Sequence, residues 1–96
     1  MVLLSVNLKA AEHQSFTQGH KLLLERKYFE AYRYFSDLYA AGGDSEMAPV
    51  YLFYKGKAGY YAGYLEPGAE AFHLLINHYP RSPYIAYAYY FLGNIQ

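Results

Sequence analysis

The chain has 96 residues, with eight acidic and eight basic side chains, and therefore a formal net charge of zero. This balance argues against a nucleic-acid partner, which attracts a basic surface. Hydrophobic residues make up 54% of the chain and include 14 tyrosines and 6 phenylalanines, a composition too apolar for a disordered segment. The chain has no cysteine, which excludes disulfides and thiolate metal sites and leaves the compartment undetermined.

The longest stretch rich in apolar residues covers residues 84–92. A helix that spans a bilayer needs roughly 20 such residues, so we expect no membrane-spanning segment. Residues 1–6 lack the basic head and the long apolar stretch that are typical of a signal peptide.

The first two helices are expected roughly over residues 9–25 and 28–41. Gly42 and Gly43 follow the second one and supply a left-handed stop. Apolar residues recur at spacings of three and four, which indicates helices and excludes alternating strands. Examples are Phe35, Leu38 and Tyr39, and later Phe72, Leu75, Ile76 and Tyr79.

Ser45 is typical of the N-cap of a third helix, with Glu46 near its positive end, and this helix continues to about residue 62. Pro49 fits this start poorly, because a proline four residues into the helix leaves one backbone hydrogen bond unmade. We expect an irregular first turn. The alternative is a later start, with Ala48 as a poor cap.

Prolines mark the start of the last two expected helices. Pro67 suits the first turn of a fourth helix, which ends near Tyr79 and Pro80. Ser82 followed by Pro83 is typical of an N-cap and the first helical residue of a fifth helix, which continues to the chain end. The sequence therefore predicts an all-α chain of about five helices, folded as one domain over residues 1–96.

A repeat of 37 residues organises these helices. Gly19, Gly56 and Gly93 follow one another at this interval. The same offset links Phe16 with Phe53 and Tyr90, Ala31 with Gly68, Phe35 with Phe72, Leu38 with Leu75, Gly43 with Pro80, and Ser45 with Ser82. Each unit reads as a helix hairpin, with repeat one at about 12–48, repeat two at about 49–85, and the first helix of a third repeat at 86–96.

Three glycines, Gly56, Gly59 and Gly63, are expected inside the third helix. Glycine within a helix costs roughly 1 kcal/mol relative to alanine, so something should compensate. Close packing of two helices is the favoured explanation, and a flexible hinge is the alternative.

This pattern resembles the tetratricopeptide repeat, from about residue 12 to the chain end. The family places small residues at positions matching Gly19, Gly56, Gly93, Ala31 and Gly68, aromatic residues at Phe35 and Phe72, and a turn proline at Pro80. Gly43 stands where the first turn proline would be. The period exceeds the usual unit of about 34 residues. In this the chain resembles the repeats of bacterial cell-envelope proteins, such as the outer-membrane assembly lipoprotein and the Tol-Pal coordinator. The resemblance leads us to expect a location in the periplasm or cell envelope.

The resemblance implies a right-handed superhelix whose first helices line a concave groove that holds a segment of a partner protein. The implied groove residues are His13, Phe16, His20 and Leu23 in the first repeat, Val50, Phe53, Lys57, Tyr60 and Tyr61 in the second, and Tyr87, Tyr90 and Asn94 in the third. One branch of the family clamps a carboxylate with lysine and asparagine. Because Phe16, His20, Phe53 and Lys57 occupy those positions here, we expect aromatic contacts with a single cation. The resemblance thus implies a protein-binding scaffold that is not an enzyme and takes no cofactor.

Two alternatives stay open. The aromatic residues of 84–91 cover more than one helix face, whereas a terminal helix should be polar, so we expect either a fragment of a longer array or a homodimer that covers this face. A self-assembly module is therefore the second hypothesis. The third is an all-helical enzyme, motivated by His13 and His20 on one helix face, but zinc needs three or four converging ligands and no such motif is present.

Overall fold

The computed structural model describes the backbone of residues 2–42 and 45–95, and the side chains of this part other than 2–10 and 12. The described residues form five helices and no strand, which confirms the predicted all-α class. The helices are α1 (Val2–Leu24), α2 (Tyr28–Gly42), α3 (Ala48–Ala62), α4 (Leu65–His78) and α5 (Ile85–Ile95). Gly43, half of the predicted stop after α2, lies outside the described residues.

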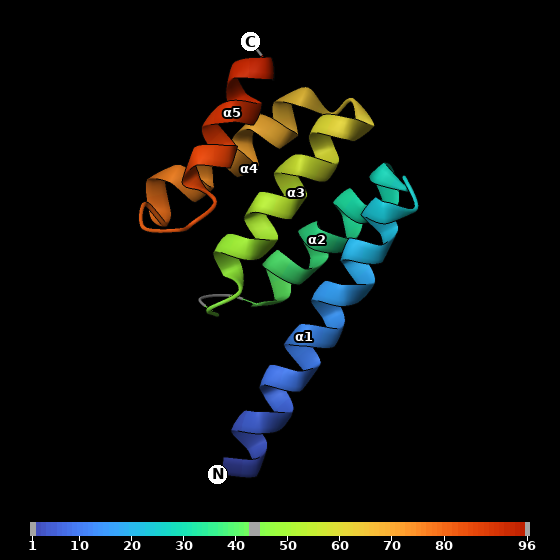
Figure 1. Cartoon of the computed structure of the whole chain (residues 1–96), viewed down its shortest axis with the longest axis vertical. Helices are drawn as coiled ribbons and strands as arrows, with labels where there is room; N and C mark the ends of the chain where they lie inside the picture. Colours follow the sequence, from blue (N-terminus) through green and yellow to red (C-terminus); the bar gives the residue numbers. More distant parts are fainter. Residues whose placement is uncertain (1, 43–44, 96) are drawn as a thin grey trace.

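Consecutive helices pack against each other as antiparallel hairpins (Figure 1). Helix α3 lies in the middle, with α2 on one side and α4 on the other, and α5 packs on both α4 and α3. The N-terminal half of α1 extends beyond the other helices (Figure 1). Helix α1 begins at Val2, earlier than the predicted residue 9, because residues 2–8 contain neither proline nor glycine to end it.

The predicted start of α3 at Ser45 is wrong. Residues 45–47 form a turn, in which the N–H of Ala48 donates to the carbonyl of Ser45 at 3.0 Å, and the helix begins at Ala48. Met47 occupies the cap position without a side-chain hydrogen bond. The later start is favoured because it places Pro49 in the first turn of the helix. A backbone N–H there has no acceptor within the helix, so proline costs no hydrogen bond.

The other two proline signals are close to correct. Pro67 is the third residue of α4, within its first turn as predicted. The Ser82 hydroxyl accepts a hydrogen bond from the N–H of Tyr84 at 3.1 Å. Regular helix α5 then begins at Ile85, two residues after the predicted Pro83.

The backbone hydrogen bonds of the turns repeat at the interval of 37 residues. The N–H of Lys27 donates to the carbonyl of Leu22 at 2.9 Å, and that of Tyr64 donates to Gly59 at 2.8 Å. The same interval relates Ala31→Lys27 to Gly68→Tyr64, Ser45→Gly42 to Ser82→Tyr79, Ala48→Ser45 to Ile85→Ser82, and Tyr51→Met47 to Ala88→Tyr84. The repeat in the sequence is therefore a repeat in the backbone.

Small residues allow the hairpins to close. A Cβ atom on Gly56 would lie 2.7 Å from the fully buried Phe72 ring, and one on Gly59 would lie 3.3 Å from the Cα of Gly68. Close packing is thus confirmed for both glycines. The expected place of Gly63 inside α3 is wrong: it ends the helix with a left-handed φ of 86°, and no atom of the described residues lies within 4 Å of its Cβ position.

Candidate functional site

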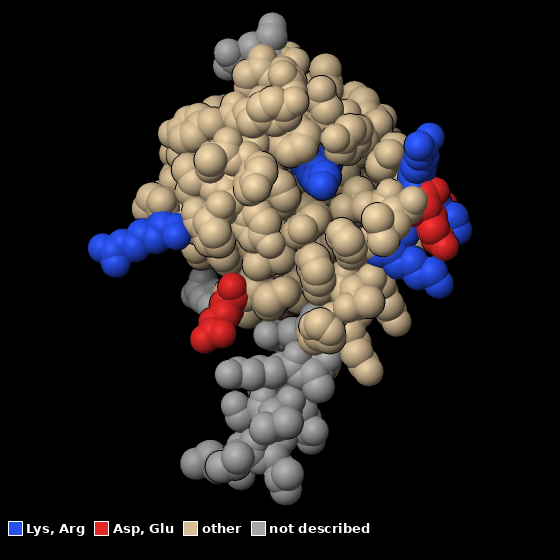
Figure 2. All heavy atoms as spheres, viewed as in Figure 1, with Lys and Arg blue, Asp and Glu red and all other residues tan. Residues whose placement is uncertain are grey.

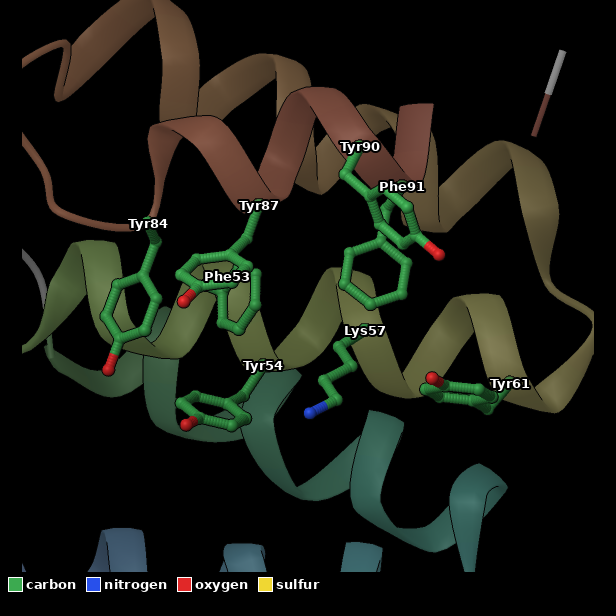
Figure 3. A pocket seen from close by; sticks show the side chains of 8 residues that line it. All are labelled: Phe53, Tyr54, Lys57, Tyr61, Tyr84, Tyr87, Tyr90 and Phe91. Carbon is green, nitrogen blue, oxygen red and sulfur yellow. The ribbon is translucent and has the colours of Figure 1, made fainter. Parts of the chain in front are cut away.

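A pocket of about 340 Å³ opens between α3 and α5 (Figure 3). Eight residues line it: Phe53, Tyr54, Lys57 and Tyr61 from α3, Tyr84 just before α5, and Tyr87, Tyr90 and Phe91 from α5. Helical spacing explains the set, because Tyr84, Tyr87 and Phe91 follow at three and four residues and so share one face. The two helices thus present aromatic side chains to a common opening.

The floor of the pocket is held by aromatic contacts. Phe53 stacks on Tyr84 with ring centroids 4.5 Å apart and planes at 14°, and Tyr54 meets Tyr84 edge-on at 5.9 Å. Phe53 also contacts Tyr87 at 6.1 Å and Phe91 at 6.1 Å. Phe53 is 4% exposed and belongs to the core, and it also lines the pocket. Aromatic rings prefer such edge-to-face and offset-stacked arrangements to a direct face-to-face sandwich.

Lys57 supplies the one charge among the residues that line this pocket. Its Nζ lies 5.8 Å from the centroid of the Tyr54 ring, within the range of a cation–π interaction. Figure 2 shows a face made almost entirely of uncharged residues, with one basic side chain near its centre and other charges at the rim. The pocket therefore combines apolar walls with a single positive charge.

Tyr54 is held in its neutral form. Burial raises the pKa of Tyr54 from 10.0 to about 12, with smaller contributions from the Tyr84 phenol and a hydrogen bond between the two side chains. Loss of a proton would leave an anion in an aromatic, half-buried place, which desolvation disfavours. The Tyr84 side chain, just before α5, thus contacts Tyr54 of α3.

Five of the predicted groove residues line this pocket together: Phe53, Lys57, Tyr61, Tyr87 and Tyr90. Tyr61 also stacks on Tyr28 of α2 at 5.2 Å, so one rim of the pocket reaches α2.

Phe16 and His20 lie apart from the pocket, at the contact between α1 and α3. Their rings stack on each other at 5.6 Å, and both meet the edge of Tyr54, at 5.0 and 5.9 Å. Leu23 is buried in a core cluster formed by α1, α2 and α3. These side chains fill a contact between helices and do not line the pocket between α3 and α5.

The other predicted residues do not join the pocket. His13 is exposed on α1, Val50 is half-buried, and Asn94 is exposed at the end of α5. Tyr60 packs against the core and meets Phe91 at 5.2 Å.

Three pocket residues were not predicted from the sequence: Tyr54, Tyr84 and Phe91. The repeat held a signal for two of them, because Tyr54 and Phe91 are separated by the same 37 residues. The family resemblance implied no groove residue at Tyr84, although Tyr84 lies one turn before Tyr87 on the same face.

Comparisons with protein-family models, with curated proteins and with solved structures find no match for this chain. None of the helices over residues 2–42 and 45–95 is long and apolar enough to cross a membrane. Within this described part, no group of three or more histidine, cysteine, aspartate or glutamate side chains could hold a metal ion.

Proposed function

We propose that the chain is a scaffold of the tetratricopeptide type that binds a segment of a partner protein in the pocket between α3 and α5. The observation that carries the proposal is the aromatic lining, which Tyr87 and Tyr90 leave open to solvent at 60% and 65% exposure. Aromatic residues around a partly solvated opening are typical of surfaces that a partner covers. The role proposed is binding, without catalysis and without a cofactor.

The chemistry of the lining indicates what the segment carries. Apolar walls favour an aromatic or aliphatic side chain, and burial of such a side chain contributes about 1.5–3 kcal/mol. Lys57 favours a carboxylate close to it, since a charge-assisted hydrogen bond is stronger than a neutral one. We therefore expect a short segment with an apolar anchor next to an aspartate, a glutamate or a terminal carboxylate.

A display library of random 16-residue peptides, selected on the immobilised chain, tests this proposal. We expect selected peptides to combine an apolar anchor with an acidic residue, and to bind Tyr87→Ala and Tyr90→Ala variants at least tenfold more weakly. Both tyrosines are exposed, so their removal should leave the fold intact. Lys57→Met should weaken acidic peptides selectively.

The matched control is Tyr89→Ala, which removes an equally exposed tyrosine (58%) of α5 that does not line the pocket. Its affinity should stay within twofold of the parent chain. Peptides that bind the Tyr87→Ala and Tyr90→Ala variants as tightly as the parent would contradict the pocket as the binding site.

Self-assembly is the second candidate, and the exposed tyrosines of α5 favour it. Tyr87, Tyr89 and Tyr90 are each more than half exposed on a helix without a charged residue. Exposed apolar patches of this kind favour association between copies. Sedimentation equilibrium over a wide concentration range decides between the two: a dimer lost in Tyr90→Ala supports assembly, and a monomer at every concentration removes it.

A further inference from the structure

Three glycines mark one position in the three successive units. Gly19 lies in α1, Gly56 in α3 and Gly93 in α5, separated by equal intervals of 37 residues. In the first two units an antiparallel helix covers this position: α2 packs on α1, and α4 packs on α3. No helix of the described chain does the same for Gly93, since nothing lies within 4 Å of its Cβ position.

The two covered glycines receive the same kind of side chain. A Cβ on Gly19 would lie 2.5 Å from the ring of Phe35, and a Cβ on Gly56 would lie 2.7 Å from the ring of Phe72. Real Cβ atoms do not approach other atoms so closely, so the ring edge occupies space that only glycine leaves free. Phe35 and Phe72 are both fully buried.

Residues around Gly93 are more exposed than the residues at the same repeat positions in α3, as expected where no helix packs over them. Leu52 is fully buried in the core cluster that contains Phe72 and Leu75, whereas its counterpart Tyr89 is 58% exposed. Gly56 is buried and Gly93 is exposed. Helix α5 thus keeps an apolar face open on the side that α4 covers in α3. We call the surface of Ala86, Tyr89, Tyr90 and Gly93 the open face of α5.

The open face continues a row of interfaces already formed within the chain. Helix α4 covers α3 and stacks Phe72 on Phe91 of α5 with centroids 5.4 Å apart and planes at 6°. Helix α5 packs on α4 and α3 (Figure 1), and Gly93 on its open face is the third of the equivalent glycine positions. Helix α5 contains no charged residue, so an occupant needs an uncharged contact surface.

We propose that the open face of α5 docks an amphipathic helix of a partner, antiparallel to α5, that inserts an aromatic ring at Gly93. The pattern of the occupant can be read from the two helices that already fill this place. Both carry a small residue, an aromatic residue four positions later and a leucine three further on: Ala31, Phe35 and Leu38 in α2, and Gly68, Phe72 and Leu75 in α4. The small residue lets the two backbones cross closely: a Cβ atom on Gly68 would lie 3.1 Å from the carbonyl oxygen of Gly56.

This surface shares Tyr90 with the pocket of the proposed function but otherwise lies on another side of α5. Gly93 is absent from the lining of that pocket, and Tyr87 lines the pocket but lies about 120° around the helix from Gly93, at roughly 100° per residue. Tyr90 lies between the two. Tyr87→Ala therefore tests binding in the pocket and Gly93→Ala tests binding at the open face, so one proposal can be wrong while the other holds.

A peptide with the sequence of residues 64–80, which contains α4, is the probe. Labelled with a fluorophore and titrated with the intact chain at concentrations where the chain is monomeric, it should show saturable binding by fluorescence anisotropy. Gly93→Ala in the chain should lower the affinity at least tenfold, because its Cβ occupies the place of the ring. Phe72→Ala in the peptide should lower it by a similar factor.

The controls distinguish the open face from peptide binding elsewhere on the chain. Gly93 is exposed with open space around it, so Gly93→Ala keeps the fold, which circular dichroism verifies. Tyr87→Ala should leave peptide affinity within twofold. Peptide binding that survives Gly93→Ala, either by displacing α4 from α3 or by entering the pocket, would overturn the proposal. So would no binding, or a dimer of the chain that Gly93→Ala abolishes, because the occupant would then be a second copy.

Discussion

At the scale of single residues, Arg26 and Gly63 occupy the same position in the two repeats, and both have a left-handed backbone conformation. Arg26, the second residue after α1, has a φ of 61°, and Gly63, the first residue after α3, has a φ of 86°. Each is followed by a residue whose N–H donates back into the helix, Lys27 to Leu22 and Tyr64 to Gly59. The second repeat satisfies this conformation with the residue suited to it, and the first does not.

Arg26→Gly should therefore stabilise the chain. An L-residue in the left-handed region costs roughly 1–2 kcal/mol, and the greater conformational entropy of glycine in the unfolded chain offsets part of the gain from removing this cost. We expect a net gain of about 0.5–1 kcal/mol in the free energy of unfolding, measured by urea denaturation. The reciprocal variant, Gly63→Ala, should lose about 1 kcal/mol. No gain in Arg26→Gly would mean that the arginine side chain contributes a contact worth the strain.

The raised pKa of Tyr54 leads us to expect that the chain loses stability at high pH. Folding raises the pKa of Tyr54 from 10.0 to about 12, so the folded chain keeps a proton that the unfolded chain releases between these values. Its contribution is complete below about pH 10 and falls as the pH rises towards 12. Tyr54→Phe retains the ring and removes this titration, so its urea midpoint should fall less between pH 9 and 11.5 than that of the parent chain.

Tyr61→Phe serves as the control, since it removes a phenol at the rim of the same pocket. Its urea midpoints over the same pH range give the effect of removing a phenol in general, which is subtracted from that of Tyr54→Phe. Identical slopes for the parent chain and Tyr54→Phe would show that other groups carry the alkaline transition.

At the scale of the elements, the glycine of each first helix reports whether a second helix covers it. Gly56 and Gly93 share one repeat position, but the ring of Phe72 lies 2.7 Å from the Cβ position of Gly56, and no atom in the described part of the chain lies within 4 Å of that of Gly93. Gly56→Ala should destabilise the chain by about 1–3 kcal/mol, since the buried ring has little room to move.

Gly93→Ala is the matched variant, and it should be neutral or stabilise by up to about 1 kcal/mol, because alanine favours helix and meets no neighbour. Thermal or urea unfolding of both variants measures the difference. Equal effects at the two positions would contradict close packing against Phe72 as the reason for glycine at position 56.

The elements themselves were largely predictable. The period of 37 residues located five helices and paired Phe35 with Phe72, because burial and turn chemistry recur with the repeat. The start of α3 was not predictable in the same way. Ser45 is a residue type that often caps helices, but Pro49 must lie in the first turn and therefore decides where the helix begins. Gly63 was misplaced for a similar reason: a glycine for a left-handed turn and one for close packing look alike in a sequence.

At the scale of the whole molecule, α3 is the centre on which the candidate site depends. It packs against α2, α4 and α5, and it contributes four of the eight residues that line the pocket. A repeat array places equivalent helices side by side, so a groove between α3 and α5 follows from the architecture. The aromatic side chains of that groove give it the composition of a binding surface.

Part of this site could be predicted and part could not. The family resemblance implied Phe53, Lys57 and Tyr90 as groove residues, and all three line the pocket. It failed for Phe16 and His20, which occupy the same repeat positions as Phe53 and Lys57 but pack on Tyr54 at the contact of α1 with α3. Whether a position lines an opening or fills a contact depends on the neighbouring helix, which the spacing within one helix does not encode.

The most direct test of whether the pocket between α3 and α5 binds a partner segment is a chemical-shift map of the ¹⁵N-labelled chain titrated with a library-selected peptide. We predict that the largest changes in amide shift fall within residues 53–61 and 84–91, which contain all the lining residues. We also expect the same peptide to leave the shifts of Tyr87→Ala almost unchanged at equal concentration. Largest changes over α1 and α2, with α3 and α5 unaffected, would contradict binding in this pocket.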